Sequence, residues 1–203
     1  MNILEGLSHH TVNMMKVKLK DMDEEKCEVV NYGIYVLLST IVKMIILLVI
    51  SYFLGVFVYC IAAMASIAVL RSFFGGVHSK TFLGCLIANS TLVLLDVYIS
   101  ILSPGQNSFY INTAIYIFCF ITVVLYVPAD HENKPVVGKK QRARYKLTSL
   151  TILIIHFLIS SFFLKQPYSN IMAISALISS ISTLPLVYKI TLNKHGDAYK
   201  YSD

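Results

Sequence analysis

Charged side chains are scarce in this sequence. Aspartate, glutamate, lysine and arginine make up 14% of the 203 residues, hydrophobic residues make up 56%, and the mean hydropathy is +0.68. Soluble globular domains usually carry about 25% charged residues. Several apolar runs approach the ~20 residues that an α-helix needs to cross hydrocarbon. The composition excludes an ordinary soluble domain and predicts an all-α, polytopic membrane helical bundle.

Motifs that would define a metal centre, a redox site or a cleavable signal peptide are also missing. The four cysteines, Cys27, Cys60, Cys85 and Cys119, show no CxxC spacing, and no HExxH sequence occurs. We therefore expect no metal and no cofactor. The first 33 residues are charged and lack an apolar signal core, so no signal peptide is expected. The net charge of +6 is explained first by basic membrane-protein loops, and no nucleic-acid partner is expected.

The apolar runs predict about six transmembrane helices after an N-terminal segment. Residues 1–33 are expected to form an amphipathic helix, interfacial or packed on the bundle, followed by a charged junction. Residues 34–203 form a single transmembrane domain in this interpretation. Its predicted spans are two within 34–70, separated by a turn near Gly55, and then 81–102, 111–127, 147–164 and 170–190, the last kinked at Pro185.

Lysine and arginine are distributed unevenly among the expected loops. With six spans and both termini inside, all of them except Lys43 and Lys165 fall in cytoplasmic segments. Basic residues collect in cytoplasmic loops of membrane proteins. The pattern therefore predicts that both termini, the stretch around 71–85 and the basic run 139–146 lie on the cytoplasmic side.

The stretch 71–85, RSFFGGVHSKTFLGC, carries the candidate chemistry. It joins two apolar runs and contains His78 and Cys85. An imidazole can take the proton of a thiol, and the resulting thiolate is a nucleophile suited to covalent catalysis. In one continuous helix the two side chains would lie ~10 Å apart along the axis, too far for proton transfer.

Two glycines argue against a continuous helix in this stretch. Gly75 and Gly76 disfavour helix, so the loop carrying His78 is expected to fold back over the start of the next span. Ser79 or Thr81 can cap that span, and Cys85 then lies near its N-terminal end, where the helix dipole favours a thiolate. The alternative that these residues leave open is a packing cysteine beside an interfacial histidine.

The order of Arg71, Gly75, Gly76, His78 and Cys85 after an apolar run resembles the accessory gene regulator protein B (AgrB) family. Members of that family are integral-membrane cysteine endopeptidases of Gram-positive quorum sensing. The resemblance continues through the segments 127–136, 165–168 and 183–186, with the basic run 139–146 following as it does in the family. It covers nearly the full length of the chain, and its most specific part is the His/Cys stretch.

This resemblance implies that His78 and Cys85 are the catalytic pair of a domain over 34–203 in a bacterial cell membrane. The implied partner is an AgrD-like signal propeptide with an amphipathic leader and an acidic tail. The family's cysteine cleaves before the tail through an acyl-enzyme thioester, and the propeptide's own cysteine then closes an autoinducing (thio)lactone ring. A homodimer is also implied.

Several other residues are candidates for supporting roles. Arg71 can clamp a substrate carboxylate or an oxyanion, or else be a topology charge. Asp130 can orient His78, or else be a solvated loop acid. The basic side chains can attract an acidic peptide tail or the anionic headgroups of the bilayer, the other expected partner; these are Lys139, Lys140, Arg142 and Arg144.

A membrane peptide transporter or exporter without covalent catalysis is the competing interpretation. Its path could be lined by the intramembrane charges Lys43 and Asp96, because charges within spans usually face a partner or a cavity. An exporter needs no nucleophile, so dependence on Cys85 separates the two hypotheses.

Overall fold

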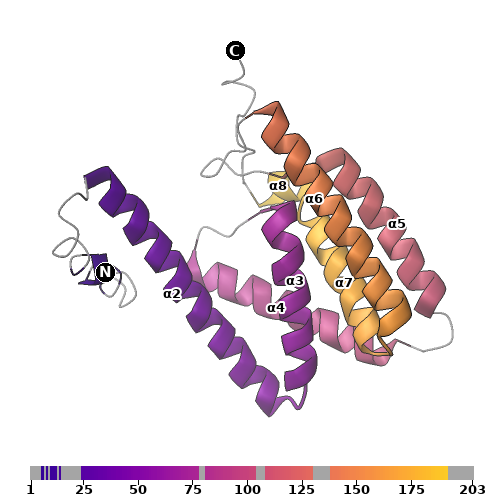
Figure 1. Cartoon of the computed structure of the whole chain (residues 1–203). Helices are drawn as coiled ribbons and strands as arrows, with labels where there is room; N and C mark the ends of the chain where they lie inside the picture. The colour runs from indigo at the N-terminus through magenta and orange to yellow at the C-terminus, as the bar shows by residue number, and fades with distance from the viewer. Residues whose placement is uncertain are drawn as a thin grey trace. The chain divides into compact units, whose positions relative to one another are not determined.

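The computed structural model describes residues 6, 8, 10–12, 14, 24–77, 81–103, 108–129 and 138–191. Within these ranges the chain is helical, apart from turns and one isolated bridge between Gly75 and Ala129 (Figure 1). The prediction of an all-α polytopic bundle is confirmed. The elements are α2 (Glu24–Phe53), α3 (Phe57–Phe74), α4 (Phe82–Leu102), α5 (Ser108–Tyr126), α6 (Lys139–Leu158), η2 (Ile159–Phe163), α7 (Tyr168–Ile181) and α8 (Pro185–Ile190).

The chain divides into two compact units, Met1–Phe53 and Leu54–Asp203. In the first unit, α2 is a single helix of 30 residues that begins at Glu24. The charged junction expected before residue 34 therefore forms the first turns of the first span, and apolar side chains such as Leu37 and Phe53 are exposed along it. Most of the N-terminal segment lies outside the described residues, and its separation from 34–203 stays a prediction.

In the part of the chain that the structure describes, five helices are long and apolar enough to cross a membrane: Cys27–Phe53, Phe57–Phe74, Phe82–Leu102, Phe109–Tyr126 and Lys139–Phe163. They match the first five predicted spans. The sixth prediction, 170–190, is divided, because α7 ends at Ile181 and α8 begins at Pro185. Proline suits the first turn of a helix, where its missing N–H costs nothing. At 14 residues, α7 is about 21 Å long, shorter than the ~30 Å hydrocarbon layer.

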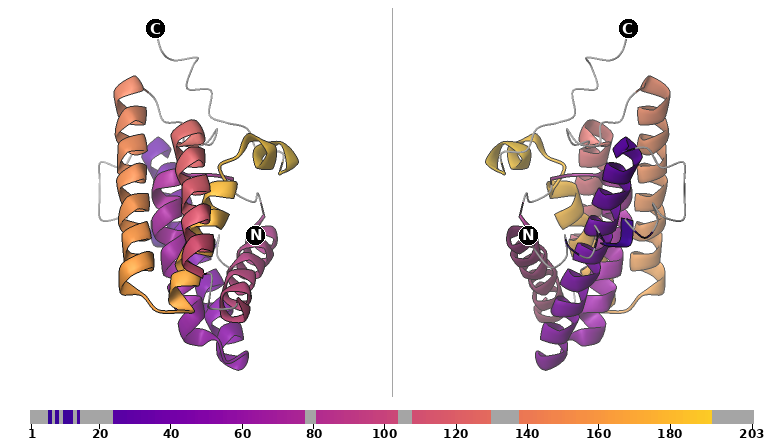
Figure 2. Two further views of the ribbon diagram at one scale, coloured as in Figure 1. Left: turned by 90° about the vertical axis from the view of Figure 1, so that its right-hand side faces the viewer. Right: turned by 90° about the vertical axis from the view of Figure 1, so that its left-hand side faces the viewer.

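The short α7 occupies the centre of the second unit. It packs against α3, α4 and α5 and also contacts α6 and η2. Small residues on α7, among them Ala173 and Ala176, are fully buried and allow this close approach. The hydrophobic core lies where α3, α5, α6 and α7 meet, and α8 turns away from the axis of α7 (Figure 2).

The basic run does not lie in a loop. Gly138 is the N-cap of α6, and residues 139–146 form the first two turns of that helix. The predicted start of this helix at residue 147 is wrong. The prediction relied on hydropathy and left out residues 139–146 because they are charged. Their lysine, arginine, glutamine and alanine side chains are nevertheless good helix formers. The basic side chains of residues 139–146 are therefore carried by the same helix that forms the apolar span.

Candidate functional site

The loop that leads to His78 begins at a sharp break after α3. The helix ends at Phe74, and Gly75 and Gly76 have φ angles of 77° and 116°. Positive φ is readily adopted only by glycine. The Gly76 amide donates a hydrogen bond to the carbonyl oxygen of Ala129 at 2.9 Å, and the Ala129 amide donates to the carbonyl of Phe74 at 2.9 Å. The predicted glycine break is confirmed, and the loop is joined to the segment after α5.

A second set of contacts joins the same loop to the end of α7. The amide of Val77 donates to the carbonyl oxygen of Ser182 at 3.3 Å. The hydroxyl of Tyr188 on α8 donates to the carbonyl of Ala129 at 3.1 Å. The ends of α3, α5 and α7 therefore meet around the short segment that precedes His78.

Cys85 lies in the first turn of α4. Thr81 is the N-cap, and its hydroxyl accepts a hydrogen bond from the amide of Gly84 at 3.1 Å, as one of the two predicted caps. The thiol is half-buried, and the side-chain amide of Asn89 donates to its Sγ at 3.7 Å. The first turn of a helix favours negative charge, because its free N–H groups and the helix dipole point there.

Arg71 contacts the loop and lies near the thiol. Its Nη2 donates to the carbonyl oxygen of Val77 at 2.5 Å, so the guanidinium fastens the residue that precedes His78. The guanidinium is also close enough to interact electrostatically with the Cys85 thiol and the Tyr188 hydroxyl.

The structure therefore describes some of the predicted site residues and not others. The structure brings Arg71, Gly75, Gly76 and Cys85 to one end of the second unit, where α3 ends and α4 begins. His78 and Asp130 lie outside the described residues. Among the residues that are described, no group of three or more His, Cys, Asp or Glu side chains could hold a metal ion.

Known proteins share this sequence organisation. The family model described as accessory gene regulator B matches residues 8–183. This chain belongs to the accessory gene regulator B family. The accessory gene regulator protein B of Staphylococcus aureus is 27% identical to it over 177 residues, which cover 84% of this chain and 89% of the relative. A putative AgrB-like protein of Listeria innocua is 26% identical over 190 residues, covering 94% and 92%.

A putative AgrB-like protein of Clostridium acetobutylicum is 25% identical over 169 residues, covering 83% of this chain and 80% of the relative. No solved structure matches the chain. As an AgrB family member with five apolar helices of spanning length in its described part, this protein is a multi-pass membrane protein of accessory gene regulation and quorum sensing.

The other described cysteines of this AgrB-family chain have different surroundings. Cys60 on α3 and Cys119 on α5 are fully buried among helices, as expected for thiols that act as small apolar side chains. Cys27 lies in the first turns of α2, in the other unit. Within the second unit, Cys85 is the cysteine that is exposed enough to react.

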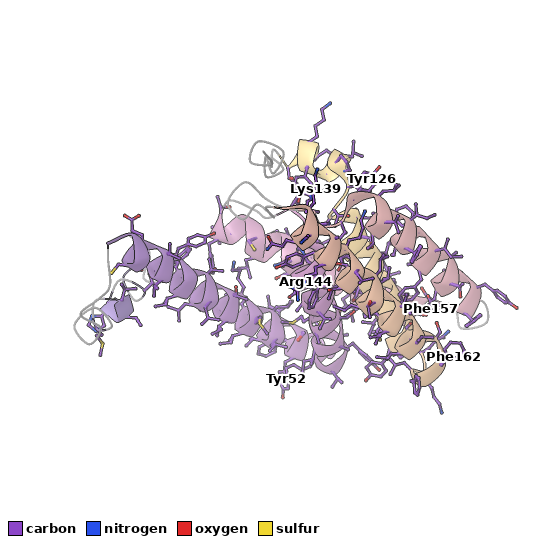
Figure 3. The ribbon with its side chains drawn as sticks, turned by 45° about the horizontal axis from the view of Figure 1, so that its top comes forward. Tyr52, Tyr126, Lys139, Arg144, Phe157 and Phe162 are labelled. Carbon is purple, nitrogen blue, oxygen red and sulfur yellow. The ribbon has the colours of Figure 1, made fainter. Side chains whose placement is uncertain are left out.

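Most of the basic residues that are described in the second unit gather at one end. Arg71 lies near the end of α3, Lys189 lies on α8, and the basic run begins α6, whereas Lys165 lies between η2 and α7 at the opposite end. Figure 3 shows the labelled Lys139 and Arg144 at one end of α6, and Phe157 and Phe162 toward the other. The Ser149 hydroxyl donates to the Phe73 carbonyl at 3.0 Å and joins α6 to the end of α3.

A cavity of about 260 Å³ opens beside this basic end. Its lining combines two aromatic rings, Phe73 and Tyr145, with polar groups of α6, Gln141, Arg144 and Thr148. Of the four basic candidates, Arg144 therefore lines a concave surface next to the end of α3. Such a surface suits an anionic group attached to an apolar body.

Sequence reasoning missed a buried polar cluster that joins three helices of the AgrB fold. The Oγ of Ser66 and the Nε2 of His156 are 2.8 Å apart, and the hydroxyl of Tyr116 is 2.8 Å from His156 Nδ1. Both ring nitrogens are thus satisfied inside the bundle, and α3, α5 and α6 are held together. In the sequence, His156 is a lone histidine within an apolar run, and this pattern does not show which side chains it bonds to.

Asp96, the intramembrane acid of the transporter hypothesis, is fully buried between α4 and α7. It accepts hydrogen bonds from Ser175 Oγ at 2.6 Å and Ser100 Oγ at 3.3 Å. Nearby, Asn170 Nδ2 donates a hydrogen bond to the Ser100 carbonyl oxygen at 3.3 Å. These contacts give Asp96 a structural explanation as part of the α4–α7 packing, while pairing with Lys43 stays a prediction.

Proposed function

We propose that this protein is an integral-membrane cysteine endopeptidase that removes the acidic tail of an AgrD-like signal propeptide and supports cyclisation of the remaining peptide. The observation that carries the proposal is the position of Cys85. It is a half-buried thiol in the first turn of α4, within electrostatic reach of Arg71, and it follows in the chain the glycine break that precedes His78. Membership of the AgrB family supports the same function.

The proposed reaction needs only the thiol, the imidazole and the propeptide. His78 takes the proton from the Cys85 thiol, and the sulfur attacks the carbonyl carbon that precedes the tail. A C–S bond forms while the C=O electron pair moves onto the oxygen. The pair then returns, the C–N bond breaks, and His78 gives its proton to the leaving amine. The tail departs and a thioester remains on Cys85.

A second acyl transfer completes the proposed sequence. The thiol of the propeptide's own cysteine loses its proton to His78 and attacks the thioester carbonyl. The new C–S bond closes the thiolactone ring as the bond to Cys85 breaks, and the proton returns to Cys85. A propeptide with a hydroxyl at that position would give a lactone by the same exchange. The step needs neither a metal nor a cofactor.

Arg71 supports this chemistry as a positioning residue. Its bond to the Val77 carbonyl fastens the segment directly before His78, and its positive charge lies within electrostatic reach of Cys85. This engagement favours a local role over the clamping of a distant substrate carboxylate. Asp130 remains the candidate that orients His78.

The basic start of α6 is proposed to attract the acidic tail. Lys139, Lys140, Arg142 and Arg144 lie in the first two turns of α6, at the end of the unit to which α3 brings the loop. Anionic headgroups of the bilayer are a second partner for the same charges. We further propose a homodimer in a bacterial cell membrane, with both termini and this end of the bundle in the cytoplasm.

The proposal is tested with purified protein in liposomes and a synthetic propeptide. Cys85→Ala is expected to abolish tail release, whereas the combined change of Cys27, Cys60 and Cys119 to alanine preserves most of it. His78→Ala should also stop turnover, because an unassisted thiol is mostly protonated near neutral pH.

A trapped intermediate distinguishes covalent catalysis from transport. A propeptide whose cyclising cysteine is replaced by alanine should leave an added mass on Cys85, and hydroxylamine should remove it. Tail release that survives Cys85→Ala would overturn the mechanism, and peptide translocation by that variant would favour the exporter.

A further inference from the structure

The side-chain amide of Asn89 lies directly beside the Cys85 thiol. Its Nδ2 donates a hydrogen bond to Cys85 Sγ at 3.7 Å, within the longer range that a sulfur acceptor allows. The two residues are one helical turn apart on α4 and about 40° apart around its axis. The amide therefore shares the face of α4 that presents the nucleophile.

Helix packing does not explain an asparagine at this position. The Asn89 side chain is exposed, in the second turn of a helix that is apolar enough to span the membrane. Asparagine is a poor helix former and is costly to expose to hydrocarbon. In the α4–α7 interface, by contrast, Asp96 and Ser100 are buried and bonded to each other. The Asn89 side chain instead contacts the thiol.

We propose that Asn89 is a further catalytic residue, whose amide stabilises the negative charge that forms at Cys85. Once His78 has taken the thiol proton, the Nδ2–H group donates to the negatively charged sulfur. When the thiolate attacks, the charge moves to the carbonyl oxygen, which is bonded to the same tetrahedral carbon as the sulfur. A side-chain amide at hydrogen-bonding distance from the sulfur can reach that oxygen by a small rotation, as donors of an oxyanion hole do.

Arg71 and Asn89 then act from different directions. The guanidinium belongs to α3 and is fastened to the loop through Val77, whereas the amide belongs to the same helix as the thiol. The cation supplies long-range attraction, and the amide supplies a directed donor one turn away. The amide can then follow the charge from sulfur to oxygen while the attraction of the cation persists.

The thiolate part of this inference is tested without any propeptide. In a protein with Cys27, Cys60 and Cys119 changed to alanine, the rate of alkylation by iodoacetamide is measured across pH. Asn89→Ala should shift the midpoint of the pH profile upward by about one unit, which corresponds to about tenfold slower alkylation well below the midpoint. Asn89→Asp, which has nearly the same shape, should shift it further, because a carboxylate repels the thiolate.

The matched control is Thr91→Ala, which removes an exposed polar side chain two residues further along α4, on another face. Its profile should coincide with that of the parent. Profiles for Asn89→Ala and Asn89→Asp that also coincide with the parent would overturn the inference. A fall in melting temperature by itself does not move this midpoint, so a merely structural role gives a different result.

The oxyanion part rests on the proposed function and is measured by tail release. Asn89→Ala should lower kcat about 100-fold, in the range for loss of one oxyanion donor, with little change in KM. An unchanged kcat beside Cys85-dependent cleavage would overturn the assignment of Asn89 alone. Cleavage that persists in Cys85→Ala would instead overturn the proposed function and leave the alkylation result standing.

Discussion

A Cβ atom placed on Gly75 would overlap the carbonyl group of Ala129. The two residues are paired in an isolated parallel bridge, and the hydrogen bonds that flank it run from Gly76 to Ala129 and from Ala129 to Phe74. Neither space nor backbone conformation admits a side chain at Gly75. The contact decides where the chain leaves α3 and so where the loop carrying His78 begins.

Gly75→Ala is therefore expected to displace this loop. The substitution forces the new methyl group against Ala129 and imposes a backbone conformation, φ 77° and ψ −141°, that costs about 1–3 kcal/mol in a non-glycine residue. Tail release should fall at least tenfold, as measured by mass spectrometry of the products, and the melting temperature should fall by several degrees.

Gly55→Ala is the matched control for this change. Gly55 has a similar φ of 70°, but nothing lies within 4 Å of its would-be Cβ. It should lose some stability to backbone strain and retain cleavage. Equal loss of cleavage in both variants would show that strain alone, and not the contact with Ala129, explains the result.

The basic start of α6 should act through charge. Changing Lys139, Lys140, Arg142 and Arg144 together to glutamine is expected to raise the apparent KM for the propeptide about tenfold at low salt. The difference should shrink as salt is added, because exposed charges are screened beyond ~10 Å at 0.1 M ionic strength. Cys85 alkylation should not change.

Lys165→Gln serves as the control, since Lys165 is exposed at the opposite end of the unit. It should leave the KM as it is. If the quadruple variant also keeps the parent's KM at low salt, these charges serve orientation and lipid binding and take no part in capturing the tail.

Membrane orientation is checked by labelling introduced cysteines. Gln141 on the first turn of α6 and Lys165 before α7 are both exposed and lie at opposite ends of the second unit. In a background without native thiols, Gln141→Cys should react with an impermeant maleimide only from the cytoplasmic side and Lys165→Cys only from outside. Reaction of both from one side would contradict the predicted topology.

The buried histidine should matter for stability and not for chemistry. His156→Ala removes the partner of both the Ser66 hydroxyl and the Tyr116 hydroxyl, inside a bundle where water does not replace it. The expected loss is about 1–2 kcal/mol, seen as a melting temperature several degrees lower. Alkylation of Cys85 should proceed at the parent's rate.

The neighbouring change Ile155→Ala provides the comparison, because Ile155 is half exposed and makes no polar contact of this kind. It should shift the melting temperature less. A His156→Ala protein with the same melting temperature as the parent would show that the contacts among these three side chains do not stabilise the bundle.

Much of the site's surroundings could be predicted from local sequence. The five long helices appear as apolar runs, the break after α3 appears as Gly75 and Gly76, and the start of α4 appears as a capping Thr81 before Cys85. Each of these is a property of a few neighbouring residues, and helix length, glycine conformation and capping need no knowledge of distant segments. The same locality explains the error at residues 139–146, where hydropathy outweighed helix propensity.

The sequence by itself therefore determined a polytopic helical membrane protein with a thiol at the start of a span. Only the tertiary structure decided that α7 lies at the centre, that Ala129 closes on Gly75, and that Ser66 and Tyr116 both bond to His156. The physical reason is that lipid tails are as apolar as a protein core. Buried and lipid-facing sides of a spanning helix have nearly the same composition, so partners are chosen by close packing and by hydrogen bonds between residues far apart in the chain.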